Sequence, residues 1–215
     1  MQNHPIPSVT DPLQYRAIGM VRGFYKPQDD DNFTRGALID SKGNEIDSVL
    51  LGRVITLIRN HVPLEKPHLW VVYPRCRNNK NLHLQISGIW EPSTLKKDLE
   101  ERDALNEASI SKDDSDDLLE GDDYFSIRGE LVFTKPENKD VVVKIRQKPR
   151  NQKKKAIPFK VNLKGEVPIN YLKHFISLDV RRVNYQLLVE DFQIIALATQ
   201  QNMDNKNRKR LDKKK

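Results

Sequence analysis

The stretch EIDSVLLGRVITLIRNHV (residues 45–62) decides the fold, because the spacing of its apolar residues changes partway along. Residues 45–49 alternate between two faces, which is the pattern of a strand. From Leu50 onward apolar side chains recur at helical spacing, and Pro63 ends the helix that this spacing predicts. The stretch therefore predicts a strand that leads directly into a short helix.

Strands on both sides of this stretch complete a first domain over residues 13–92. Apolar runs bounded by turn residues predict four further strands. They cover residues 15–25, 33–40, 69–73 and 82–90. A turn with Gly43 joins the second strand to the third. The predicted order is three strands, one helix and two strands.

The same order returns in a second domain over residues 124–197. Its strands are predicted over residues 124–134, 141–147, 157–163, 178–183 and 187–195. Tyr171, Leu172 and Phe175 indicate a short helix before the last two strands. The openings of the two domains also echo each other, residues 21–27 against residues 127–130 and 133–136. The chain is therefore expected to repeat one unit.

The net charge of +7 hides an uneven distribution of charge along the chain. Residues 98–123 hold 12 Asp and Glu against 2 Lys and Arg, whereas residues 124–215 hold 9 against 22. The run repels itself, and Ile110 is its one aromatic or β-branched residue, so it cannot bury enough apolar area to offset the entropy lost on ordering. We expect residues 93–123 to form an acidic, disordered linker whose first part has helical spacing. Residues 1–12 and 198–215 are predicted to be a flexible N-terminus and a basic disordered tail.

The repeated element order resembles the oligonucleotide/oligosaccharide-binding (OB) fold, as in tandem OB-fold proteins of a bacterial family. The resemblance implies a mainly β chain of two small OB-like barrels, each with one short helix. It also implies a ligand surface on the second and third strands and on the loops that join the first strand to the second and the fourth to the fifth. In the first barrel the loop over residues 74–81 would offer Arg75, Arg77 and Lys80. The loop over residues 26–32 has three consecutive aspartates, so it either points away from a phosphate backbone or serves a protein partner.

The candidate nucleic-acid contacts are cations concentrated in the second domain, where their field attracts polyanions. They are Lys144, Arg146, Lys148, Arg150, Lys153, Lys154, Lys155, Lys160, Arg181 and Arg182, with Arg75, Arg77 and Lys80 from the first. The lysines of residues 153–155 could also form a plain solvated loop. The candidates for base stacking are Tyr25, Tyr73, Phe133 and Tyr185, each of which could instead pack in a core. Trp70 and Trp90, in or beside apolar strands, are expected to be structural.

Enzymatic chemistry finds little support in the sequence. It has no glycine-rich phosphate loop and no nucleophile elbow, and its five histidines lack metal-ligand spacing. Cys76, the single cysteine, excludes an internal disulfide and fits a reducing compartment. Because Cys76 stands between Arg75 and Arg77, the sequence predicts a lowered pKa for its thiol. We expect no catalytic residue, metal or cofactor.

These observations predict a cytoplasmic, non-enzymatic protein that binds single-stranded DNA or RNA with low sequence specificity. Binding would use the basic second barrel and the tail. No stretch is apolar enough to span a membrane, and no small-molecule substrate is indicated. The alternative is an adaptor module that docks on a nucleoprotein machine such as a ribosome or polymerase. In either case the acidic linker could fold back on the second barrel as a mimic of nucleic acid.

Overall fold

The computed structural model describes residues 4–29, 31–77, 81–91, 121–147 and 157–198. The chain divides into two compact units. The first unit is built mainly on Gly19–Tyr73 and on the chain from Leu84 to Tyr124. The second is built on the chain from Phe125 and also includes Ser8–Ile18 and Pro74–His83. Where one folding domain ends and the next begins therefore stays a prediction.

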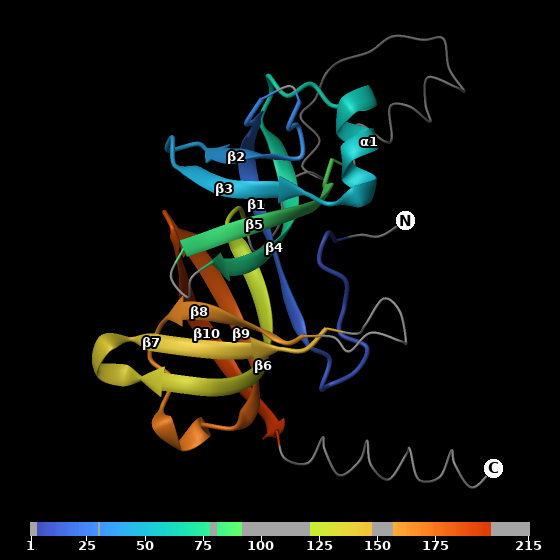
Figure 1. Cartoon of the computed structure of the whole chain (residues 1–215). Helices are drawn as coiled ribbons and strands as arrows, with labels where there is room; N and C mark the ends of the chain where they lie inside the picture. The colour runs from blue at the N-terminus through green and yellow to red at the C-terminus, as the bar shows by residue number, and fades with distance from the viewer. Residues whose placement is uncertain (1–3, 30, 78–80, 92–120, 148–156, 199–215) are drawn as a thin grey trace, which may run out of the picture. The chain divides into compact units, whose positions relative to one another are not determined.

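The first of two barrels is closed and has five strands (Figure 1). Its elements are β1 (Arg16–Pro27), β2 (Arg35–Asp40), β3 (Glu45–Leu50), α1 (Gly52–His61), β4 (His68–Arg77) and β5 (Asn81–Ile89). Hydrogen bonds order the strands β1-β2-β3-β5-β4, and β4 pairs back with β1. β3 and β5 run parallel, with Ser48 opposite Leu84. This order, with a helix between the third and fourth strands, confirms the predicted OB-like barrel.

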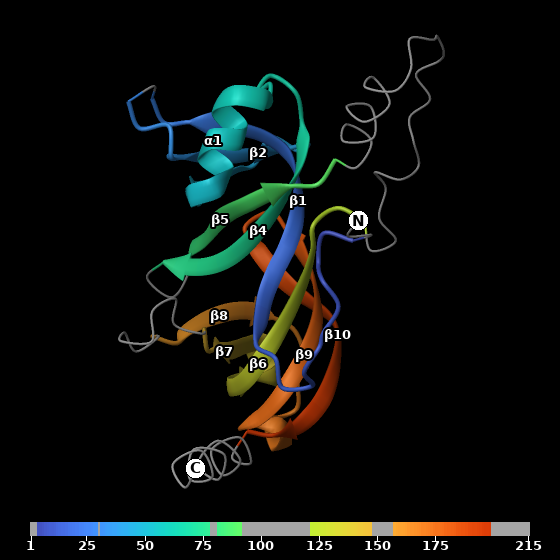
Figure 2. The same ribbon diagram turned by 90° about the vertical axis from the view of Figure 1, so that its right-hand side faces the viewer.

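The second unit repeats this topology (Figure 2). Its elements are β6 (Tyr124–Lys135), the 3-10 helix η2 (Pro136–Asn138), β7 (Asp140–Ile145), β8 (Phe159–Lys164), the 3-10 helix η3 (Ile169–Tyr171), β9 (His174–Val183) and β10 (Gln186–Leu197). The strand order is β6-β7-β8-β10-β9, and β9 pairs back with β6. The short helix predicted before the last two strands is η3, whereas Phe175 lies in β9 and is fully buried.

The first strand of each barrel has a glycine where a neighbouring strand comes too close for a side chain, and in the first barrel this glycine lies where the strand changes partner. β1 pairs with β4 through Gly19–Gly23 and with β2 through Gly23–Pro27, so it changes partner at Gly23. A Cβ atom on Gly23 would lie 2.1 Å from the backbone oxygen of Ile39. In the second barrel a Cβ atom on Gly129 would lie 2.6 Å from the backbone oxygen of Lys144. Only glycine allows the strands to approach so closely.

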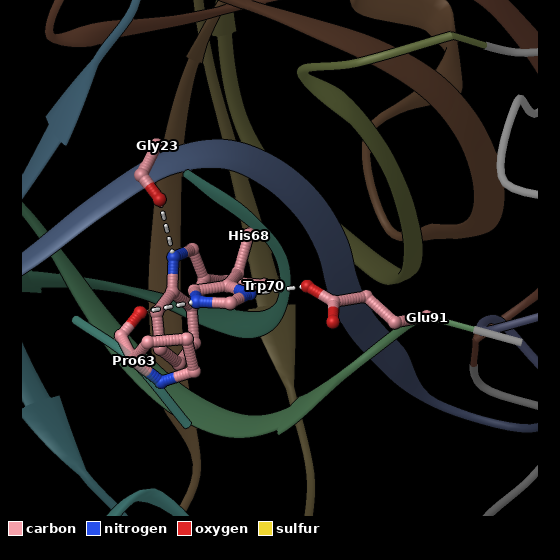
Figure 3. A network of polar contacts seen from close by, with 5 residues as sticks. All are labelled: Gly23, Pro63, His68, Trp70 and Glu91. Atoms are coloured by element: carbon pink, nitrogen blue, oxygen red, sulfur yellow. Dashed lines mark hydrogen bonds and ion pairs between the residues drawn. The ribbon is translucent and has the colours of Figure 1, made fainter. Parts of the chain in front are cut away.

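A buried polar network fixes β4 next to this corner (Figure 3). Trp70 is fully buried and its Nε1–H donates to the carbonyl oxygen of Gly23 at 2.8 Å. Next to it, the His68 ring contacts the carbonyl oxygen of Pro63 through Nε2 at 2.7 Å and the carboxylate of Glu91 through Nδ1. The ring also meets the Trp70 indole edge to face, with 5.6 Å between the ring centroids. The network ties the ends of β4, β5 and the helix connection together, and Trp70 is structural as predicted.

The structure corrects one predicted loop and describes only a small part of the predicted acidic linker. The loop predicted over residues 74–81 is wrong at both ends, because β4 continues to Arg77 and β5 begins at Asn81. The predicted acidic linker lies outside the described residues except for residues 121–123, where Asp122 forms an ion pair with Arg22 at 2.8 Å. Of the predicted basic tail only Ala198 is described, and it is buried, with its N–H donating to the carbonyl oxygen of Lys173 at 2.8 Å. None of the helices in the described part of the chain is long and apolar enough to cross a membrane.

The closure at Gly23 predicts a large cost for a methyl group there. Gly23→Ala should destabilise the first barrel by about 3 kcal/mol, the upper end of the usual cost of overpacking. The matched control is Gly52→Ala at the start of α1, where a Cβ atom would meet nothing within 4 Å. Urea unfolding followed by circular dichroism measures both changes. Equal stability of the two variants would contradict this account of barrel closure.

Candidate nucleic-acid interface

The outer face of β7 and β8 carries polar side chains in register. Val141, Val143 and Ile145 of β7 are buried, so the alternate residues of that strand point outward. β8 follows the same alternation and pairs antiparallel with β7. The outward pairs are Asp140 with Lys164, Val142 with Asn162, and Lys144 with Lys160. Three rows of side chains therefore cross these two strands.

A β-bulge in β6 adds an aromatic residue to this face. Leu131 pairs with Val143, but the next paired residue is Phe133, opposite Val142, so Val132 is the extra residue. Strict alternation from the fully buried Leu131 would turn Phe133 into the core. The bulge shifts the alternation of inward and outward side chains by one residue. Phe133 therefore lies on the outer face with 46% of its surface exposed, beside Val142 and Asn162.

These residues line a groove of about 710 Å³, which we call the β7–β8 groove. Its walls include Phe133, Val142, Lys160, Asn162, Cys76 and Tyr185. Tyr185 comes from the turn between β9 and β10 and is 52% exposed. The preceding residue, Asn184, has a left-handed backbone (φ 54°), which asparagine tolerates in tight turns. Two exposed aromatic rings from separate hairpins thus line one concave surface.

Acidic neighbours bind most of the cations around the groove. Lys144 and Arg146 both contact the carboxylate of Glu130, at 2.9 and 3.3 Å. Lys164 contacts Asp140 at 2.7 Å. Lys160 is exposed, and its side chain forms no ion pair or hydrogen bond with any residue that the structure describes. Of the predicted cations on this face, Lys160 is therefore the one best placed to meet a phosphate.

Three other predicted cations are engaged elsewhere. Arg181 forms an ion pair with Glu190 at 3.1 Å. Arg182 is only 3% exposed and donates to the carbonyl oxygen of Asn184 at 2.7 Å, which corrects its assignment as a phosphate contact. Arg75 lies over the ring of Phe159, 3.7 Å from its centroid. The remaining candidates lie outside the described residues, and they are Lys80, Lys148, Arg150, Lys153, Lys154, Lys155 and the side chain of Arg77.

The structure separates the predicted stacking residues. Phe133 and Tyr185 come together in the β7–β8 groove. Tyr25 is wrong as a stacking residue, because it is 1% exposed and its hydroxyl donates to the carbonyl oxygen of Phe33 at 3.0 Å. Burial raises the pKa of Tyr25 to about 12. Tyr73 is half-buried in β4.

Sequence reasoning missed Phe24, which stands next to Tyr25 and is 37% exposed on the outer face of the first barrel. The signal was available in the alternation of β1. If Tyr25 faces the core, its neighbour must face out. Which of the two adjacent aromatics is buried depends on whether the residue after Gly23 points inward or outward. Strand pairing, and not the local sequence, decides this.

Cys76 lies in β4 and lines the β7–β8 groove. The backbone N–H of Asn162 donates to its Sγ at 3.4 Å. Burial raises the pKa of the Cys76 thiol, so the predicted lowering is wrong. The described residues also contain no group of three His, Cys, Asp or Glu side chains that could hold a metal ion.

Two protein-family models match the chain. One is the N-terminal OB-fold domain of the PatR RNA-binding protein, which matches residues 17–97. The other is a C-terminal cyanobacterial OB-fold-like RNA-binding domain, which matches residues 127–196. Together they cover most of both barrels and more than half of the 215 residues. Comparison with curated proteins and with solved structures finds no match.

The raised pKa of Cys76 has a direct chemical consequence. Less thiolate is present at a given pH, so alkylation by iodoacetamide should be slow near neutral pH. The midpoint of the rate against pH should lie above that of the same chain unfolded in urea, which is the control. Because Cys76 is the single cysteine, mass spectrometry of the intact protein reports on it alone. A folded-state midpoint at or below the unfolded one would contradict the assignment.

Proposed function

Because the chain belongs to the family of RNA-binding proteins with two OB-fold domains, we propose that it binds single-stranded RNA through the β7–β8 groove. The observation that carries this proposal is that Phe133 and Tyr185 line the same groove. The role is binding without catalysis and without a cofactor. The proposed location is the cytoplasm, since a single cysteine suits a reducing compartment.

Stacking accounts for the exposure of the two rings. An aromatic side chain left about half in water forgoes the burial that ordinarily stabilises it, whereas stacking a base on it recovers that burial. The faces of bases are available in single strands and are covered in a duplex. A volume of about 710 Å³ is in the range of sites that bury a small ligand. These properties favour unpaired nucleotides as the ligand.

The groove is suited to binding with little sequence preference. Every base has a face that can stack, so aromatic stacking tolerates all of them. Asn162 in the groove wall belongs to a residue type that both donates and accepts hydrogen bonds, which suits more than one base edge. Lys160 supplies a charge for the phosphate, which carries no sequence information. The family match favours RNA over DNA as the natural ligand.

Removing either ring tests the stacking role. Phe133→Ala and Tyr185→Ala should each weaken binding of a labelled single-stranded RNA, about 12 nucleotides long, by about 1–3 kcal/mol, the usual value of one stacked base. Fluorescence anisotropy at low salt measures the affinity. The control is Ile169→Ala, an exposed apolar residue in η3 outside the groove. Wild-type affinity in both aromatic variants would refute the proposed site.

The role of Lys160 has a separate signature in the salt dependence. Lys160→Gln should weaken binding to all sequences alike and make the log–log salt slope shallower by about 0.7, the value for one phosphate on a single strand. Lys66→Gln changes the net charge equally at an exposed position of the first barrel and serves as the control. If both variants shift the slope equally, Lys160 acts only through net charge and contacts no phosphate.

A further inference from the structure

The two barrels carry equivalent rows of side chains on their outer faces. We infer that the row of the first barrel, Phe24–Ile39–Glu45, is a second RNA subsite and that it prefers guanine. The inference rests on the proposed function, since it assumes that the second barrel stacks bases on Phe133. The resemblance to the OB fold already implies a ligand surface on the second and third strands, and the inference adds the residues that would contact a base there and the base that they prefer.

The first strands of the two barrels end in similar sequences. Residues 24–27 read FYKP and residues 133–136 read FTKP. Phe24 and Phe133 are exposed, and the residues after them, Tyr25 and Thr134, are buried. Both buried hydroxyls donate to a backbone carbonyl, Tyr25 to Phe33 at 3.0 Å and Thr134 to Val167 at 2.6 Å. Each barrel therefore anchors an inward hydroxyl and presents the preceding ring outward.

The match continues across the two strands beside the ring. Phe24 pairs with Ile39, and Ile39 pairs with Glu45. In the second barrel Phe133 pairs with Val142, which pairs with Asn162. Directly paired residues on adjacent strands share a face. Each row thus consists of an aromatic ring, a branched aliphatic residue and a polar residue, and two strand spacings of about 4.8 Å separate its ends.

The polar end of the row differs between the barrels and sets the preference. An amide donates and accepts, whereas the carboxylate of Glu45 only accepts. Guanine presents two neighbouring donors, N1–H and N2–H₂, so it can bind a carboxylate through two hydrogen bonds. Uracil flanks its one donor with two carbonyl oxygens, which a carboxylate repels. A base stacked on Phe24 should therefore be preferred when it is guanine.

Charge around the first row also favours base contacts over phosphate contacts. Glu45 is exposed and forms no ion pair with the described residues. Asp47 is exposed on the same strand, and Asp29 and Asp31 lie in the loop after β1. Such a surface disfavours a phosphate backbone but not a neutral base edge. The acidic loop is thus compatible with a subsite that depends on base identity and only weakly on salt.

The test follows both subsites at once in the full-length protein. ¹⁵N-labelled protein is titrated at low salt with the trinucleotides UGU and UUU, and amide shifts are read at Ile39 and Glu45 and at Val142 and Asn162. We expect UGU to bind the first row about fivefold more tightly than UUU, the lower end for a bidentate base contact. Phe24→Ala should abolish the shifts of the first row and leave those of the second. Glu45→Gln should remove the guanine preference, whereas Glu65→Gln, an exposed control outside the row, should keep it.

The outcomes separate this inference from the proposed function. Shifts confined to the second row would overturn the first subsite and leave the function of the second barrel intact. Shifts of the first row that are equal for UGU and UUU would overturn the guanine preference. An absence of shifts in both rows would reject the proposed function together with the inference.

Discussion

The first barrel closes at a position where two backbones come too close for a side chain. Gly23 is paired with Asp40 on one side and His68 on the other, so a single residue joins β1 to both of its neighbours. The carbonyl oxygen of Gly23 also accepts the Trp70 hydrogen bond, which secures β4 at the same point. Any Cβ atom there would overlap backbone, which cannot move aside as a side-chain end can.

The same constraint sets which residues face outward. Counting from Gly23, the next residue, Phe24, is exposed and Tyr25 is buried. In the second barrel Phe133 follows Gly129 by four residues, and strict alternation across that interval would reverse its orientation. The bulge at Val132 restores the outward orientation of Phe133. The two barrels therefore reach the same outward ring through different spacings, which explains why the sequence echo between them is interrupted.

Spacing along the chain was enough to predict the order of elements in both barrels, because a change from strand to helix period is local. It was not enough where the answer depends on pairing. The fourth strand was predicted to end at residue 73, yet β4 continues to Arg77. Cys76 has arginine neighbours in sequence, but adjacent residues of a strand point to opposite faces, and Arg75 packs on Phe159 instead. A count of cations likewise could not reveal that Arg182 is buried.

The electrostatics of the second barrel show why aromatic placement is more informative than net charge. Glu130 alone binds Lys144 and Arg146, so two predicted phosphate contacts are balanced within the face itself, and Asp140 likewise binds Lys164. A phosphate that displaced these carboxylates would exchange one ion pair for another and gain little. Phe133 and Tyr185 are about half exposed, so a base stacked on either ring adds to its burial. Affinity in this barrel should therefore come chiefly from stacking, with Lys160 and the basic sequence beyond the described residues setting how strongly RNA is attracted before it stacks.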